Sequence, residues 1–125
     1  MLRFLSADWL RAFDEALRAA GVGGRFAANP IAIAQEVGGA ADAVRYVVVL
    51  DGQGGRIDHD GIADVTFVCD RDTAAGLAQG TMNAQRALTS GRLKIKGEVD
   101  RLAAASAALA GLGDVLADLR ADTEF

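Results

Sequence analysis

The sequence predicts an α+β domain in which one five-stranded sheet carries helices on one face. Apolar residues recur at helical spacing near both ends of the chain, and the five segments between them show either the alternation or the β-prone composition of strands. The 125 residues, 51% hydrophobic and 24% charged, suffice for one domain with its own core. We therefore expect a single domain over residues 1–125, in the order helix, four strands, two short helices, strand, helix.

The first predicted helix covers residues 7–20. Ser6 is a suitable N-cap, and Gly21 follows the last apolar position of the pattern. Trp9, Phe13 and Leu17 recur on one side of this helix, so they are expected to face the sheet.

Four strands are predicted next. Residues 31–37 alternate, with Ile31, Ile33, Gln35 and Val37 on one face, and residues 44–50 form the most β-prone run. The glycine-rich turn at 51–55 predicts a hairpin to a short strand at 56–58, and a fourth strand covers 63–69. Because short turns join these strands, we expect them to be antiparallel.

The rest of the chain is predicted to hold two short helices, the fifth strand and a long helix. The short helices cover residues 74–79 and 83–88, and the strand covers 92–96. A crossover connection can lie between the fourth and fifth strands, which the two helices separate. The last helix covers 99–119 and is interrupted by Gly111 and Gly113. Its Ala-rich face either packs tightly on the sheet or leaves a cavity.

Composition excludes several classes of protein. A net charge of -4 and a pI near 4.8 argue against a nucleic-acid partner. The single cysteine and single histidine exclude an internal disulfide and a multi-histidine metal site, and no cofactor is expected. The N-terminus lacks a signal-peptide pattern, and the charge-free run 102–113 is too short to span a bilayer, so we expect a cytoplasmic protein.

No residue pattern predicts catalysis, so the protein is not expected to be an enzyme. His59 is interpreted as a solvated turn residue between two aspartates, and Cys69 as a small apolar strand residue. The glycines at 52–55 lead into a strand rather than a helix, which favours a hairpin over a phosphate loop. Lys94 and Lys96 lie on a solvated sheet face or attract an anionic head group.

The segment 80–97 resembles the signature of the sterol carrier protein type 2 family. Gly80, Asn83, Gly91 and the run Leu93-Lys94-Ile95 agree with that signature in register, over eighteen residues. The resemblance implies an apolar tunnel between the sheet and the helices, which binds sterols, fatty acids, acyl-CoA esters or phospholipids with little selectivity. The end of the chain, 122–125, departs from the peroxisomal address that many members carry. The excess of Arg over Lys favours a bacterial source.

The expected partner is therefore an apolar lipid, with at most transient membrane contact and no identified protein partner. The last helix is expected to act as a lid, and the Gln85 amide to pair with a polar group of the lipid. The alternative is an interaction or regulatory module that kept the fold but filled its cavity. The predicted ligand-binding residues are Phe13, Leu17, Ile33, Val48, Val65, Phe67, Met82, Gln85, Leu88, Ile95, Leu109, Leu112 and Leu116.

Overall fold

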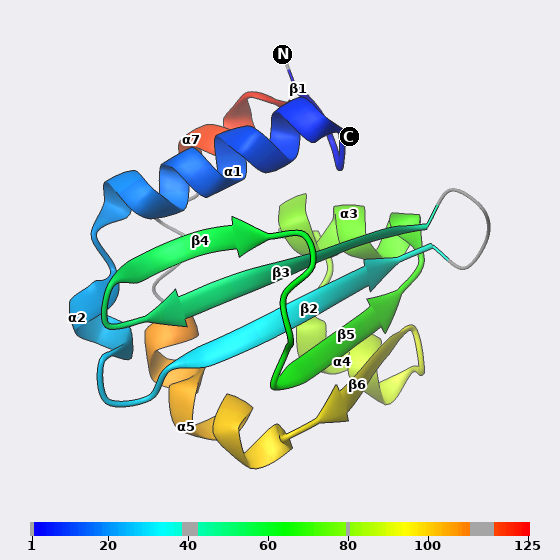
Figure 1. Ribbon diagram of the computed structural model, residues 1–125. Coiled ribbons are helices and arrows are strands. Elements are labelled where there is room, and N and C mark those ends of the chain that lie inside the picture. Colours follow the sequence, from blue (N-terminus) through cyan, green and yellow to red (C-terminus); the bar gives the residue numbers. More distant parts are fainter. Residues whose placement is uncertain (1, 39–42, 80, 111–116) are drawn as a thin grey trace.

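A computed structural model describes residues 2–38, 43–79, 81–110 and 117–125 and contains a five-stranded mixed sheet (Figure 1). The strand order across the sheet is β4-β3-β2-β5-β6. The strands are β2 (Ile31–Val37), β3 (Val44–Asp51), β4 (Gly54–Asp58), β5 (Val65–Cys69) and β6 (Leu93–Gly97). The expected five-stranded α+β fold is confirmed.

The helices lie on one side of this sheet. In Figure 1, α3, α4 and α5 lie behind the strands, and α1 and α7 lie together near the β4 edge. The helices are α1 (Ala7–Ala20), α2 (Gly23–Phe26), α3 (Arg71–Gln79), α4 (Ala84–Thr89), α5 (Val99–Ala110) and α7 (Ala117–Ala121). The interruption expected at Gly111 and Gly113 lies outside the described residues. None of the helices within the described residues is long and apolar enough to cross a membrane.

The strand pairing corrects one expectation. Hairpin-like neighbours β2–β3 and β3–β4 are antiparallel as expected, but β5 does not return beside β4 and instead pairs in parallel with β2. The crossover therefore lies between β4 and β5, whereas β5 and β6 are antiparallel neighbours despite the two helices between them.

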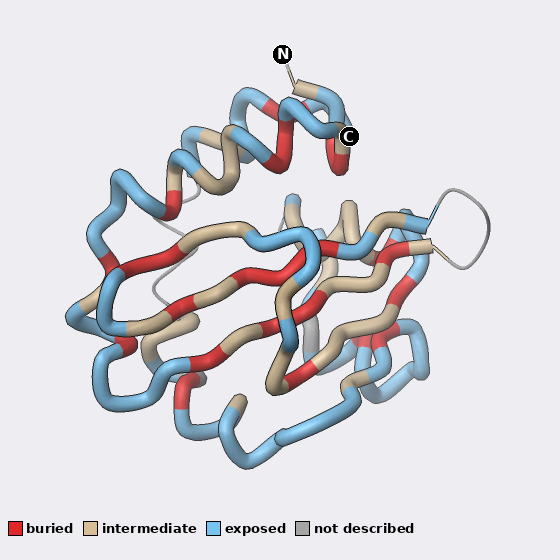
Figure 2. The backbone as a smooth tube through the Cα atoms, viewed as in Figure 1, coloured by how far each residue is buried: buried red, intermediate tan, exposed pale blue. Residues whose placement is uncertain are grey.

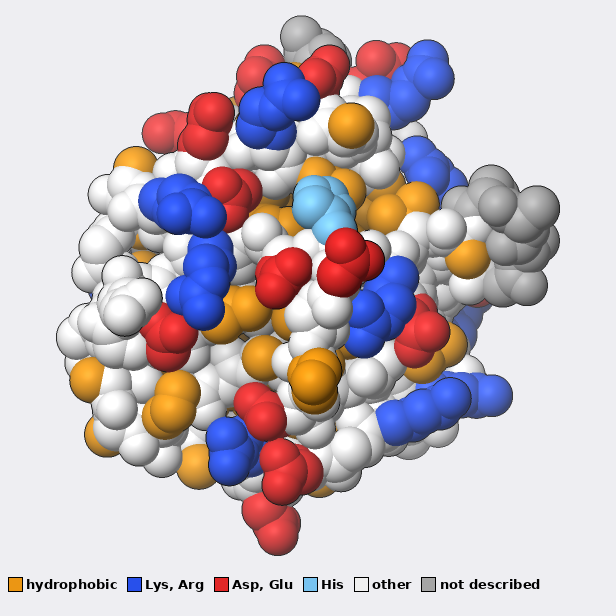
Figure 3. Space-filling view, in the orientation of Figure 1, with side chains coloured by type: hydrophobic (Ala, Val, Ile, Leu, Met, Phe, Trp, Pro, Cys, Tyr) orange, Lys and Arg blue, Asp and Glu red, His pale blue; other side chains and the backbone are white. Residues whose placement is uncertain are grey.

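Asp64 fixes this unexpected placement of β5. Its Oδ2 accepts a hydrogen bond from the Ala32 amide at 2.9 Å, and its own amide donates to the Ala32 carbonyl at 2.9 Å. The segment that leads to Asp64 crosses the face of the sheet that the helices leave uncovered (Figure 1). Charged side chains of both signs are scattered over this outer face (Figure 3).

The register brings apolar side chains into rows on the inner face. Ile33 lies between Val48 of β3 and Val65 of β5, and one row further along Gln35 lies between Tyr46 and Phe67. Buried positions run along all the central strands (Figure 2).

One end of the inner face is filled by α1 and α2. We call this the packed end, and its fully or almost fully buried side chains are Leu17, Val22, Phe26, Ile31 and Leu50. The close approach of α1 to β4 favours glycine at position 55, where an added Cβ would lie 3.1 Å from the Leu17 Cβ. Among the described residues, these side chains fill the space between this end of the sheet and the helices α1 and α2.

The two ends of the chain meet beside α1. The short strand β1 (Leu2–Arg3) pairs in parallel with β7 (Thr123–Glu124), a pairing that the sequence pattern did not predict. The indole Nε1 of Trp9 donates to Thr123 Oγ1 at 3.1 Å, and Arg71 Nη2 donates to the Phe4 carbonyl at 2.8 Å. The C-terminal segment is therefore tied to α1 and, through Phe4, to α3.

Candidate functional site

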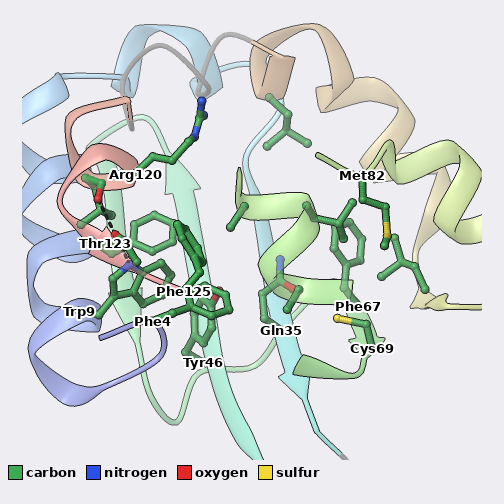
Figure 4. Close-up of a pocket in the computed structure, with 17 residues that line it drawn as sticks. Phe4, Trp9, Gln35, Tyr46, Phe67, Cys69, Met82, Arg120, Thr123 and Phe125 are labelled. Atoms are coloured by element: carbon green, nitrogen blue, oxygen red, sulfur yellow. Dashed lines mark hydrogen bonds between the residues drawn. The ribbon is translucent and has the colours of Figure 1, made fainter. Parts of the chain in front are cut away.

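A cavity of about 660 Å³ lies between the inner face of the sheet and the helices, away from the packed end (Figure 4). We call this part of the face the hollow end. Its lining comes from β2, β3, β5 and β6, from α1, α3, α5 and α7, and from the two chain termini. The lining residues are Phe4, Trp9, Phe13, Gln35, Tyr46, Phe67, Cys69, Ala74, Leu77, Ala78, Met82, Leu93, Leu109, Leu119, Arg120, Thr123 and Phe125.

The floor of the cavity follows from strand alternation. Gln35, Tyr46 and Phe67 form one row across β2, β3 and β5, and Cys69 faces Leu93 on β6 in the next row. Because successive side chains of a strand point to opposite faces, all five project toward the helices.

Part of the roof over this floor comes from α3, which contributes two small residues. α3 lines the cavity with Ala74, Leu77 and Ala78, and the side chains of the two alanines fill little volume. The helix begins directly after β5, where the Asp70 carboxylate accepts a hydrogen bond from the Thr73 amide at 2.7 Å. Hydrogen bonds from the Thr73 side chain and backbone lower the pKa of Asp70. This cap fixes the position of α3 over the cavity.

Aromatic rings form the wall on the α1 side. The ring of Phe4 lies 5.0 Å from those of Trp9 and Phe125, and Trp9 also contacts Phe13 edge-on at 5.2 Å. Figure 4 shows the rings of Phe4, Trp9 and Phe125 gathered beside Tyr46, and the hydrogen bond between Trp9 and Thr123 at this wall. Such edge-on contacts add stability beyond the burial of the rings.

Uncharged groups make up the described lining in the interior of the cavity. Burial raises the pKa of the Tyr46 phenol, with a smaller contribution from Cys69, and burial also raises the pKa of the Cys69 thiol. Both groups are therefore protonated at neutral pH. Arg120 is the single charged residue among the described lining residues, and its side chain is exposed. No cluster of described residues could hold a metal ion.

The sequence model of the SCP-2 sterol transfer family matches residues 27–110, which include β2 to β6 and α5. The chain belongs to the SCP-2 sterol transfer family. The resemblance seen in the segment 80–97 is thus confirmed, and that segment forms α4 and β6. No match was found among curated protein sequences.

Solved structures of sterol carrier proteins share the fold. A conserved hypothetical protein of Thermus thermophilus, described as possibly a sterol carrier protein, has a TM-score of 0.71 at 21% identity, over 95% of this chain and 91% of that one. A crystal structure of sterol carrier protein 2 has a TM-score of 0.69 at 19% identity, and the match covers 94% of this chain and 97% of that one. Apo sterol carrier protein 2 of Yarrowia lipolytica is 27% identical, with a TM-score of 0.51, and the match covers 68% of this chain and 73% of that one.

The structure brings four of the predicted ligand-binding residues to the cavity of this SCP-2 domain. Phe13, Phe67, Met82 and Leu109 line it. Four others, Leu17, Ile33, Val48 and Val65, are buried in the core outside the lining, and the half-buried Ile95 packs against that core. Leu112 and Leu116 lie outside the described residues.

Gln85 and Leu88 lie outside the cavity. Both are exposed on α4, because this six-residue helix directs Ala87, which is 1% exposed, toward the core. A polar residue that does line the cavity is Gln35, which was not predicted to bind ligand. The sequence did indicate that Gln35 faces inward, because it shares the alternation of Ile31, Ile33 and Val37.

Proposed function

We propose that this SCP-2 domain holds the apolar body of one lipid molecule in the cavity and carries or presents it without chemical change. The observation that carries the proposal is a cavity of about 660 Å³ whose described lining is mainly aromatic and aliphatic. This volume lies within the range of about 300–1,000 Å³ that small-molecule sites occupy. Membership of a lipid-transfer family supports the same interpretation.

Apolar burial alone supplies the affinity. Each methylene of the lipid that leaves water gains about 0.8 kcal/mol, so a long chain or a ring system binds without a charged partner. Because the interior is neutral, salt should change the affinity little. A fatty acid, an acyl ester or a sterol-like molecule would place its apolar part here and any charged group at the exposed rim near Arg120.

Two features weigh against the other functions considered. A module with a filled cavity would have no space of this size between sheet and helices. An enzyme would need a reactive group with a partner base, yet His59 is exposed on the β4–β5 connection and is not part of the lining, and the Cys69 thiol is held protonated by burial.

The chain contains its own reporter for a binding experiment. Trp9 is the single tryptophan and lines the cavity, so energy transfer from Trp9 to the fluorescent fatty acid cis-parinaric acid reports binding at this site. We expect saturable transfer with one ligand per chain and a Kd in the micromolar range or below, nearly independent of salt.

A matched pair of variants locates the ligand. Ala78→Phe fills the hollow end and should abolish transfer, whereas Ala19→Phe places the same ring on the exposed side of α1 and should leave binding unchanged. Absence of transfer in the unaltered protein, or equal binding by the two variants, would contradict the proposed function.

A further inference from the structure

Two polar groups lie side by side on the floor of the otherwise apolar cavity. Gln35 of β2 and Tyr46 of β3 are direct partners in the antiparallel ladder, and both side chains line the cavity. Figure 4 shows the Gln35 amide pointing into the cavity from the middle of the floor, between the aromatic wall and Phe67.

The fold itself does not use these two groups. Among the residues that the structure describes, no hydrogen bond joins the Gln35 amide or the Tyr46 hydroxyl to another protein group. Neither group is sealed in the core, because every fully buried side-chain nitrogen or oxygen in the described part of the chain has a partner. Both therefore face the open volume of the cavity, where water or a ligand must satisfy them.

The hydrogen-bonding groups of Gln35 and Tyr46 suit an uncharged oxygen atom of a ligand. The amide offers two donors and an acceptor, and the protonated phenol offers a donor and an acceptor. Figure 4 shows Arg120 extending away from this floor. A carboxylate or phosphate placed on the floor would be buried without a counter-charge, whereas a hydroxyl or carbonyl group would be fully hydrogen-bonded.

We infer that Gln35 and Tyr46 are specificity-determining residues that bind a hydroxyl or carbonyl oxygen on the body of the lipid. The protein thereby prefers oxygenated lipids to plain chains of the same length. This inference rests on the proposed function. A plain chain would displace the water from both groups and leave them unpaired, and sites of this kind discriminate strongly against a ligand that lacks the polar group.

The test compares stearic acid with a series of monohydroxystearic acids that differ only in the position of the hydroxyl. Each competes with cis-parinaric acid for the unaltered protein and for Gln35→Met, Tyr46→Phe and the double variant. Met matches the length of Gln without its amide, and Phe removes only the hydroxyl. Glu36→Met is the matched control, because position 36 of β2 faces the opposite side of the sheet.

We expect at least one hydroxylated isomer to bind the unaltered protein about 10-fold more tightly than stearic acid, the discrimination of one well-made hydrogen bond. Each single variant should reduce this ratio, the double variant should bring it near one, and Glu36→Met should retain it. Gln35→Met should bind stearic acid at least as tightly as before. A purely structural role would lower both affinities and leave their ratio unchanged.

Three results would overturn the inference, and the last of them is distinguishable from the first two. If stearic acid binds but every isomer binds within about 2-fold of it, or if the preference survives in the double variant, the specificity assignment is wrong and the proposed function stands. If neither stearic acid nor any isomer displaces cis-parinaric acid, the proposed function fails together with the inference.

Discussion

The packed end and the hollow end belong to the same face of the same sheet, yet one is solid and the other holds a cavity. At the packed end the floor residues Ile31 and Leu50 are covered by Leu17, Val22 and Phe26, all of them at most 2% exposed. At the hollow end the floor residues Gln35 and Phe67 share the lining of a cavity with Ala74 and Ala78 of α3. The floor is continuous, so the size of the covering side chains decides where a ligand fits.

The largest expected effect is the difference in stability between truncating a large side chain at the packed end and truncating one at the hollow end. Phe26→Ala removes a ring that is 0% exposed and should cost about 3–5 kcal/mol of unfolding free energy. Met82→Ala only enlarges an existing cavity and should cost about 1 kcal/mol or less. Urea unfolding of the two variants measures the difference. Equal costs would show that the two ends are packed alike.

Enlarging an alanine of the core and an alanine of the hollow end tests the same comparison in the opposite direction. Ala105 of α5 is 1% exposed, so Ala105→Leu should overpack the core and cost about 1–3 kcal/mol. Ala78→Leu places the same extra carbons in open space, so the melting temperature should stay the same or rise while lipid affinity falls. Thermal melting and cis-parinaric acid binding check both variants. Strong destabilisation by Ala78→Leu would contradict the claim that open space lies beside this residue.

A smaller effect is expected where the C-terminal segment lines the cavity. Thr123→Val keeps the shape of the side chain but leaves the Trp9 indole without its acceptor, which should cost about 1–2 kcal/mol. Because Thr123, Leu119 and Phe125 line the cavity, bound lipid should also leave faster. Stopped-flow displacement measures the off-rate. An unchanged off-rate with lowered stability would show that this segment supports the core without acting as a lid.

The smallest expected effect is a pH dependence of the α3 cap. The folded pKa of Asp70 lies below its ordinary value of 3.8, so its contribution to stability is present above pH 3.8 and is lost as the pH falls through the lower folded pKa. Asp70→Asn should remove that part of the acid sensitivity and little else. Unfolding free energies of both proteins across this range provide the check. Parallel pH profiles would contradict the assignment.

Sequence alone predicted the strands well because their alternation is local. The pattern of residues 31–37 and 63–69 gives both the strands and their inward faces. The parallel pairing of β2 with β5 could not be read in this way, because it depends on contacts such as that of Asp64 with Ala32, far apart in the chain. The two-residue strands β1 and β7 are too short to show any pattern.

The candidate site was harder to predict, for a physical reason. Inward-facing residues of both ends look alike in the sequence, so Ile33 and Val65 were grouped with Phe67 although they lie in the solid core. Which of them borders a cavity depends on the helix that covers it. Gln35 could have been recognised as an inward polar residue within an apolar alternation, whereas the contribution of Phe125 required the meeting of the termini.

The central claim is that the hollow end, and not the packed end, takes up the lipid. The most direct test is a titration of ¹⁵N-labelled protein with a fatty acid, followed through backbone amide chemical shifts. Shifts should concentrate at Gln35, Tyr46, Phe67 and Cys69, while Ile31, Leu50 and Phe26 stay near their free positions. Shifts centred on the packed end, or spread evenly over both ends of the sheet, would contradict this account.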